Sequence, residues 1–293
     1  MKRSWCLPCL GLVLSGCGGG PSGSSDLPVA IRVVAGDTGE PVAGAQVLLD
    51  GRSYTTVPSG EIVLDAETRA SGHPLRVDSP GFLVRETVAP RANADAITLW
   101  PVRGAYSDAY VRSLLYKPSD SGLADPANVP DQPLMRVVET RVSLVAEGDL
   151  RADEAAMAVV RRGVDVLNEA TLGQVVFSLD DTPTASVVFR LVQDPTMRDG
   201  AFTYRTLRAN AVIGGRIVFS KRAGFDPIRD VRYIVHELGH VLGLQHSTAP
   251  SDMMYFSAHS GSPLTFSADE RLTIKLLLQR APGNQYPDRD RNL

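Results

Sequence analysis

An eleven-residue stretch, HELGHVLGLQH, contains three of the five histidines in this chain of 293 residues. His236 and His240 are four positions apart, so on an α-helix both imidazoles project from the same face. Gly243 follows where the helix has to end, because glycine tolerates the left-handed backbone that terminates helices. The chain can then turn and bring His246 back to that face. The stretch therefore predicts a helix over residues 230–244 that gathers three imidazoles.

Three neutral imidazoles suit zinc, and they leave a fourth coordination position open for water. Glu237 lies one step round the helix from the first histidine, so its carboxylate points near the ion without taking the same ligand direction. A carboxylate in that place can act as a general base toward water. We therefore predict His236, His240 and His246 as ligands of one catalytic zinc ion and Glu237 as the base. The competing interpretation is a buried amphipathic helix with incidental histidines, which gives no reason for the glycine and the third histidine to fall in register.

The composition limits the class of protein. Apolar residues make up 43% and charged residues 22%, which fits an ordinary globular protein that is long enough for two domains. The net charge of −3 argues against a nucleic-acid partner. Cys6, Cys9 and Cys17 are the only cysteines in the sequence. The rest of the chain therefore has neither a disulfide nor a thiolate metal ligand and depends on its apolar core.

The N-terminus has the order of a targeting segment. Two basic residues precede the apolar stretch WCLPCLGLVL, and LSGC then ends at Cys17. This order resembles the lipobox of bacterial lipoproteins, in which the signal is cleaved before the cysteine and the thiol receives a lipid. The resemblance implies a signal peptide over residues 1–16 and a flexible tether over residues 17–26. The alternatives are an ordinary secretory signal or a short buried apolar segment. Gly18 is not the aspartate associated with inner-membrane retention, which favours the outer membrane or the cell surface.

Residues 27–102 alternate strand-like runs with turn clusters at intervals of about 8–12 residues, as is typical of an all-β sandwich. The pair Asp50-Gly51 between two such runs predicts a tight hairpin. The segment GEPVAGAQVLL, from Gly39 to Leu49, resembles the transthyretin-like (carboxypeptidase regulatory-like) domains found beside carboxypeptidases and in secreted bacterial proteins. In those proteins the module is usually a spacer or a binding accessory.

The chain changes character after this segment. Residues 103–132 are rich in Pro, Ser, Asp and Gly and are expected to form a linker, with a short helix at DAYVRSLLY. Residues 133–285 predict an α+β domain with strands at MRVVETRVSLV, QVVFSL, ASVVFRLV, GAFTYRTL and AVIGGRIVFSK. Ser267 and Glu270 have the spacing of a capping box at the start of a C-terminal helix. Residues 286–293 are expected to be a tail.

The full pattern H-E-x-x-H-x-x-G-x-x-H is the metzincin signature, and the chain matches it at every specified position. Ser247, a methionine eight residues after the third histidine, and FSADE before the last helix resemble the matrixins. The likeness implies a mixed twisted sheet with an active-site helix and a C-terminal helix, and it implies that Met254 is the Met-turn residue beneath the metal. Met253 is the alternative, because SDMMY also resembles the Met-turn of astacins and serralysins. Tyr255 would then be a candidate for a further zinc ligand.

The sequence also departs from the matrixin pattern. Phe256 stands where matrixins usually have proline, so the wall of the S1′ substrate pocket stays undefined. Tyr255 and Phe256 are nevertheless assigned to substrate binding. No second histidine cluster and no cysteine-switch motif precede the helix, so neither a structural zinc ion nor cysteine-based latency is expected. His259 is expected at the surface rather than as a ligand. The strand GAFTYRTL, residues 200–207, is expected at the sheet edge, where it can pair with a substrate backbone.

These features predict a zinc-dependent endopeptidase that is attached to a bacterial membrane through lipidated Cys17 and acts as a monomer on peptide or protein substrates. One alternative is a non-catalytic surface-binding or adhesion lipoprotein with a structural zinc site, which would have no need of a base such as Glu237. Another is a zinc amidase acting on cell-wall peptides, which would use the same site. Calcium binding stays open, because no residue pattern supports it, and the sequence does not give the cleavage preference.

Overall fold

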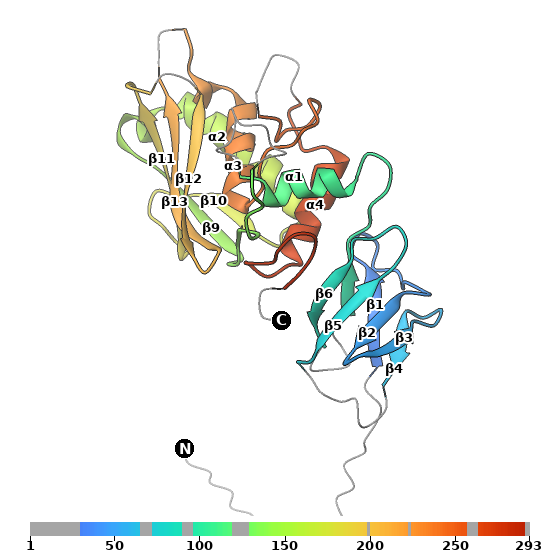
Figure 1. The fold of residues 1–293 in the computed structure, drawn as a ribbon. Helices are drawn as coiled ribbons and strands as arrows, with labels where there is room; N and C mark the ends of the chain where they lie inside the picture. The colour runs from blue at the N-terminus through green and yellow to red at the C-terminus, as the bar shows by residue number, and fades with distance from the viewer. Residues whose placement is uncertain are drawn as a thin grey trace, which may run out of the picture.

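The chain forms two groups of secondary-structure elements (Figure 1). The computed structural model describes residues 30–64, 72–89, 96–118, 129–197, 200–221, 224–256 and 263–290. The expected signal peptide, the lipidation site Cys17 and the tether lie outside these residues. Among the helices that are described, none combines the length and the apolar character that crossing a bilayer requires.

The first group consists of strands, arranged in two sheets with the orders β4-β1-β7 and β3-β2-β5-β6. The strands are β1 (Ala30–Ala35), β2 (Gln46–Leu49), β3 (Arg52–Thr55), β4 (Glu61–Val63), β5 (Pro74–Asp78), β6 (Arg85–Val88) and β7 (Ala96–Leu99). Their buried side chains form one apolar cluster that includes Val33, Val47 and Leu99. The predicted hairpin is confirmed, because β2 and β3 pair antiparallel around Asp50 and Gly51, whose φ angles of 49° and 76° suit a two-residue turn. The likeness to transthyretin-like domains stays a prediction.

The second group is a mixed twisted sheet packed against helices (Figure 1). Its strand order is β10-β9-β11-β13-β12, with the short β8 beside β13. The elements are β8 (Arg136–Val137), β9 (Arg141–Ala146), β10 (Val176–Leu179), β11 (Val187–Asp194), β12 (Ala201–Arg208), β13 (Ala211–Ser220), α1 (Asp108–Tyr116), α2 (Glu154–Thr171), α3 (Val231–Leu242) and α4 (Ala268–Leu278). β12 is antiparallel to β13 and is the outermost strand, as predicted for GAFTYRTL. The architecture agrees with the expected catalytic domain.

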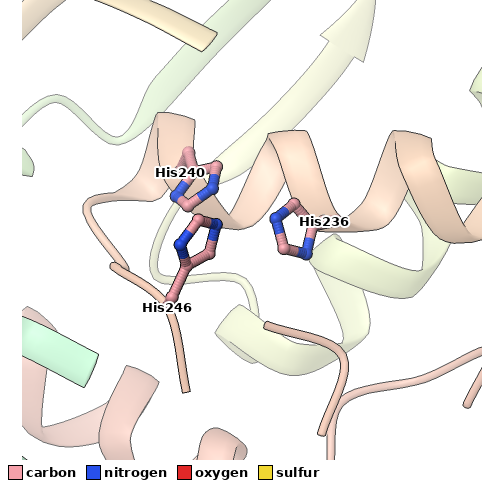
Figure 2. A group of neighbouring side chains, drawn as sticks. All are labelled: His236, His240 and His246. Atoms are coloured by element: carbon pink, nitrogen blue, oxygen red, sulfur yellow. The ribbon is translucent and has the colours of Figure 1, made fainter. Parts of the chain in front are cut away.

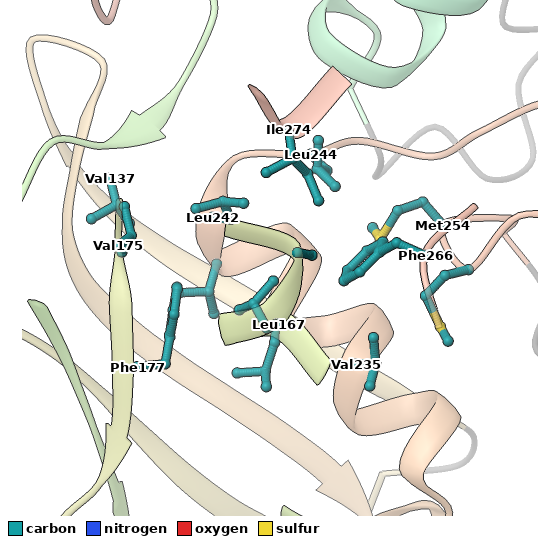
Figure 3. Packing of buried hydrophobic residues seen from close by; sticks show 14 of the residues in the cluster. Val137, Leu167, Val175, Phe177, Val235, Leu242, Leu244, Met254, Phe266 and Ile274 are labelled. Atoms are coloured by element: carbon teal, nitrogen blue, oxygen red, sulfur yellow. The ribbon is translucent and has the colours of Figure 1, made fainter. Parts of the chain in front are cut away.

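One apolar core joins this sheet to its helices (Figure 3). Phe177 from β10, Leu167 from α2 and Val235 from α3 are buried in it. α2 and α3 approach closely at Gly163, where a Cβ atom would lie 2.4 Å from Cγ2 of Ile234. Dense packing of this kind makes a helix a rigid support. α3, which carries two of the predicted ligands, is therefore fixed between α2 and the edge of the sheet.

Two expectations need correction, one about a strand and one about the linker. MRVVETRVSLV forms two strands, β8 and β9, rather than one, because residues 138–140 bend out of extended geometry. The short helix expected at DAYVRSLLY is confirmed as α1. It is not part of a linker, however, because its Tyr110, Leu114 and Tyr116 are buried in the core of the second group. The polar composition of the residues after α1 gave no sign that this short helix packs into the core.

The expected tail, residues 286–293, is also more than a tail where it is described. The carboxylate of Asp288 is fully buried and accepts hydrogen bonds from Arg280 (2.8 Å) and from Arg85 (2.7 Å). The backbone N–H of Glu86 on β6 donates to the carbonyl of Asp288 (2.9 Å). The segment therefore ties the two groups of elements together. A polar sequence gave no sign of this burial, because one of the two compensating arginines, Arg85, lies 203 residues away in the chain.

Candidate metal centre and catalytic site

Two residues set the limits of α3. The side chain of Asp230 accepts a hydrogen bond from the N–H of Arg232 (3.0 Å), which satisfies one of the free donors at the helix start. Gly243 ends the helix with φ +132°, and a Cβ atom there would lie 2.1 Å from the carbonyl oxygen of Met135. Both the backbone angle and the close approach require glycine. The predicted helix and its glycine end are confirmed, and the chain then carries His246 back toward α3.

The three predicted ligands come together (Figure 2). The ring centroids of His236 and His240 are 4.8 Å apart, and that of His246 lies 5.3 Å from the first and 5.0 Å from the second. Each ring offers one nitrogen, and these nitrogens all lie within 4.8 Å of one another. The group is therefore compact enough to hold one metal ion.

Hydrogen bonds fix the orientation of two rings. Nδ1 of His236 lies 2.9 Å from the carbonyl oxygen of Met253, and Nδ1 of His240 lies 2.9 Å from that of Leu244. Because a carbonyl oxygen only accepts, each Nδ1 carries the proton and donates it. The lone pair of both rings is then on Nε2. This is the arrangement in which backbone acceptors orient metal-binding histidines.

Burial keeps the imidazoles neutral. Desolvation lowers the pKa of His236, and it lowers that of His240 well below the ordinary range, with the two neighbouring histidines adding to the effect. Desolvation and the neighbouring His236 lower the pKa of His246 to about 4. Neutral imidazole is the form that binds metal ions, and three such donors fit zinc.

Glu237 is buried beside the histidines and is held by the edge strand. Its Oε2 accepts a hydrogen bond from the hydroxyl of Thr203 on β12 (2.7 Å), and the same hydroxyl lies 3.1 Å from the backbone carbonyl of Glu237. Burial raises the pKa of Glu237 to about 7, and the bond from Thr203 opposes that shift. Arg205 on β12 also donates to the carbonyl of His240 (3.4 Å). The edge of the sheet therefore lies directly against the helix that carries the site.

Met254 is completely buried against α3. A Cβ atom at Gly239 would lie 2.3 Å from its Sδ, so the thioether fills the space that this glycine leaves. The carbonyl of Met254 accepts from the N–H of Ser247, the residue after the third histidine (2.8 Å). Met253 is buried too, and its carbonyl accepts the hydrogen bond from Nδ1 of His236. The assignment of Met254 as the Met-turn residue stays a prediction that this geometry fits.

Glu270 fastens the methionine turn to α4. Its Oε1 accepts from the N–H of Met254 (2.7 Å), and its Oε2 accepts from those of Met253 (3.1 Å) and Ser267 (2.7 Å). The capping box predicted from Ser267 and Glu270 is confirmed. Burial raises the pKa of Glu270 to about 7, and the backbone donors oppose the shift. One carboxylate thus caps a helix and anchors the turn beneath the histidines.

The remaining predicted residues are less constrained. The rings of Tyr255 and Phe256 lie 4.6 Å apart, and Phe256 is 56% exposed. Tyr255 also forms a backbone bridge with Ser247, which brings it near the third histidine in the fold. Their assignment to substrate binding stays a prediction, and His259 lies outside the described residues.

Sequence reasoning missed the partners of the predicted residues. Thr203 was part of a predicted edge strand, but strand periodicity does not say which helical side chain a threonine meets. Glu270 was recognised as a helix cap, while its bonds to the methionine turn depend on a loop that folds back in space. Asp252, which is buried and accepts a hydrogen bond from the hydroxyl of Ser247, carried no pattern that a single sequence reveals.

Comparison with known proteins supports the same class. The matrixin family model matches residues 208–277, a span that includes α3, the three histidines, the methionine turn and most of α4. No curated protein sequence matches the chain closely enough to count as a relative. The match and the histidine group together support a metzincin-like, zinc-dependent peptidase at the level of the family.

Proposed function

We propose that this protein is a zinc-dependent endopeptidase of the matrixin type. The proposal rests mainly on one observation: three neutral imidazoles and the buried carboxylate of Glu237 meet beside the edge strand β12. A purely structural zinc site needs ligands and gives no role to an adjacent base. The matrixin match over residues 208–277 supports the same assignment.

The chemistry follows from the positions of these groups. His236, His240 and His246 would hold the ion, the first two through Nε2. A bound zinc ion supplies a Lewis acid that polarises the substrate carbonyl and a water molecule. Glu237 takes a proton from the water molecule while the water oxygen bonds to the carbonyl carbon of the substrate. Glu237 then passes this proton to the amide nitrogen as the C–N bond breaks. Thr203 holds Oε2 of the base in place during both transfers.

The edge strand offers a binding surface for the substrate backbone. β12 is the outermost strand of the described sheet, and its partner on the inner side is β13. An extended peptide can add to such an edge through main-chain hydrogen bonds, which hold any sequence in register. Side-chain selectivity would then come from the residues around the histidines, for which Tyr255 and Phe256 are our candidates.

Metal content and hydrolysis test the proposal together. The purified protein should contain about one zinc ion per chain, as a three-histidine site implies. Replacing His236 and His240 together with alanine should remove it. Glu237→Gln should keep the zinc ion and lower the cleavage rate of a quenched peptide library by about 100-fold or more. Zinc that survives the double histidine replacement, or full activity of Glu237→Gln, would show that the site is assigned wrongly.

The same assay separates the alternatives. A lipoprotein with a structural zinc site would contain zinc and cleave nothing, with or without chelator. A zinc amidase would cleave cell-wall peptides and leave the protein-derived library intact. An endopeptidase should cleave the library and lose this activity on chelation.

We further propose that Cys17 is lipidated and anchors the protein to a bacterial membrane, with the outer membrane or the cell surface favoured by Gly18. The proposal is supported by the order of basic residues, apolar stretch and LSGC. Wild-type protein should incorporate labelled lipid and sediment with membranes, and Cys17→Ala should block both lipidation and processing at this site. Equal labelling of both proteins would exclude this anchor.

A further inference from the structure

The loop that carries the third histidine, residues 244–252, depends on other parts of the chain for its position. It contains no helix, and its one bridge is that between Ser247 and Tyr255. His236 and His240 are fixed by α3 and by the carbonyls that orient their rings. His246 has left the helix, so its placement requires contacts to its loop.

α1 provides contacts on both sides of this histidine. The backbone N–H of Gln245 donates to the carbonyl of Leu114 (2.8 Å), and the hydroxyl of Ser113 donates to the carbonyl of His246 (3.0 Å). Ser113 and Leu114 are consecutive, buried residues of α1. The peptide groups before and after the imidazole are therefore both held by one turn of the same helix.

A buried carboxylate extends this attachment to the end of the loop. Oδ2 of Asp252 accepts hydrogen bonds from the hydroxyl of Tyr110 on α1 (2.6 Å) and from that of Ser247 (2.5 Å). All three residues are buried. Hydrogen bonds to a charged acceptor out of contact with water are among the stronger ones in proteins. The loop is thus clamped to α1 at its end as well as at the histidine.

We propose that α1 is a part of the metal centre, in which Ser113 and Tyr110 act as positioning residues for His246. The inference rests on the proposed function, since it assumes a metal ion at the three histidines. The inference goes beyond the proposed function, because α1 precedes the residues that the matrixin family model matches. Without α1, two ligands would stay in place on α3 while the third would sample other positions, so the site would bind metal less tightly.

Point variants of the full protein test this with zinc affinity as the readout. Ser113→Ala and Tyr110→Phe each remove one hydroxyl and should each weaken zinc binding about tenfold, the effect expected when a group that orients a ligand is lost. Ser113→Thr keeps the hydroxyl and should restore affinity. Tyr116→Phe is the matched control, because Tyr116 is also buried on α1 but donates to Asn284 (2.5 Å), away from the loop.

Affinity is measured by competition with a chromogenic chelator, and thermal melting and near-ultraviolet circular dichroism confirm that each variant is folded. Wild-type affinity in both Ser113→Ala and Tyr110→Phe would overturn the proposal, and so would an equal loss in Tyr116→Phe, which would indicate a general effect of helix stability. Ser113→Ala and Tyr110→Phe remove separate contacts, so the proposal can be tested with either variant if the other does not fold. A wild-type protein that binds no zinc would contradict the proposed function itself, which is a different outcome.

Discussion

Gly239 lies in α3 between His236 and His240, two of the proposed ligands, at the point where Met254 packs against the helix. Its replacement by alanine is a direct test of that contact. The added Cβ atom would lie 2.3 Å from Sδ and 3.1 Å from Cε of Met254, with the ring of Phe266 at 3.6 Å. Non-bonded heavy atoms prefer about 3.5–4.0 Å. Met254 must therefore move by more than about 1 Å.

The sizes of two opposing effects set the expected change in stability. Alanine is favoured over glycine in a helix interior by about 1 kcal/mol. Overpacking a filled core costs about 1–3 kcal/mol, and Met254 is completely buried with its backbone held by Glu270 and Ser247. The net loss is about 0–2 kcal/mol, which lowers Tm by up to about 8 °C in a domain of this size. The displaced turn also carries the carbonyl that orients His236. Zinc affinity should therefore fall about tenfold or more.

Gly163→Ala is the control for this variant. Its Cβ atom would lie 2.4 Å from Cγ2 of Ile234, so it causes a similar clash at the contact of α2 with α3, away from the methionine turn. Both variants should lose stability in chemical denaturation, while Gly239→Ala alone should lose zinc affinity strongly in chelator competition. If Gly239→Ala binds zinc as tightly as Gly163→Ala does, then Met254 does not support the site.

Two further predictions concern carboxylates that the fold buries. Thr203→Val removes the hydroxyl that binds Glu237 and should lower kcat about tenfold with little change in KM and in zinc content, because a hydrogen bond to a charged group is worth about 1.5–3 kcal/mol. Thr203→Ser should keep most of kcat, and a rise of KM in Thr203→Val with kcat intact would mean that the threonine serves the substrate strand instead. Burial raises the pKa of Glu270 from its usual 4.5 to about 7, so between these values the folded protein holds a proton that the unfolded chain has released. The free energy of unfolding should therefore contain a term that decreases as pH rises from about 4.5 to about 7. Glu270→Gln should be less stable overall, since an amide cannot accept all three N–H bonds. Its stability should decrease less over this pH range than that of the wild type, because the contribution of Glu270 is lost while that of Glu237, whose pKa burial also raises to about 7, remains. Denaturation curves with the same pH slope for both proteins would exclude the assignment.

The grouping of the three histidines was largely predictable because its information is local. Helix periodicity places His236 and His240 on one face, and Gly243 has to be glycine for a reason that the sequence displays, so the order of helix, turn and third histidine follows from eleven residues. The hairpin at Asp50 and the capping box at Ser267 are local in the same sense. Each was predicted from residues at most a few positions apart.

The supports of the site were not predictable because they join distant segments. Ser113 lies far from His246 in sequence, and nothing about an isolated serine in a short helix indicates that it will meet a ligand loop. The burial of Asp288 likewise depends on Arg85, which reaches its carboxylate from the first group of strands. Such pairings depend on the final packing of the elements, and a single sequence has no periodicity that records them.

The segment that contains Asp288 and Asp290 also closes an exposed edge. The backbone N–H of Glu86 donates to the carbonyl of Asp288 (2.9 Å), and the carbonyl of Glu86 accepts from the N–H of Asp290 (3.0 Å). The segment therefore covers part of the outer side of β6. Open strand edges are templates for pairing with other chains and for aggregation. A chain shortened to end at Arg280 would uncover β6 and would leave the guanidinium groups of Arg85 and Arg280 buried without these carboxylates. Removing residues 281–293, which include none of the three histidines, would thus make the protein prone to aggregate through this strand edge.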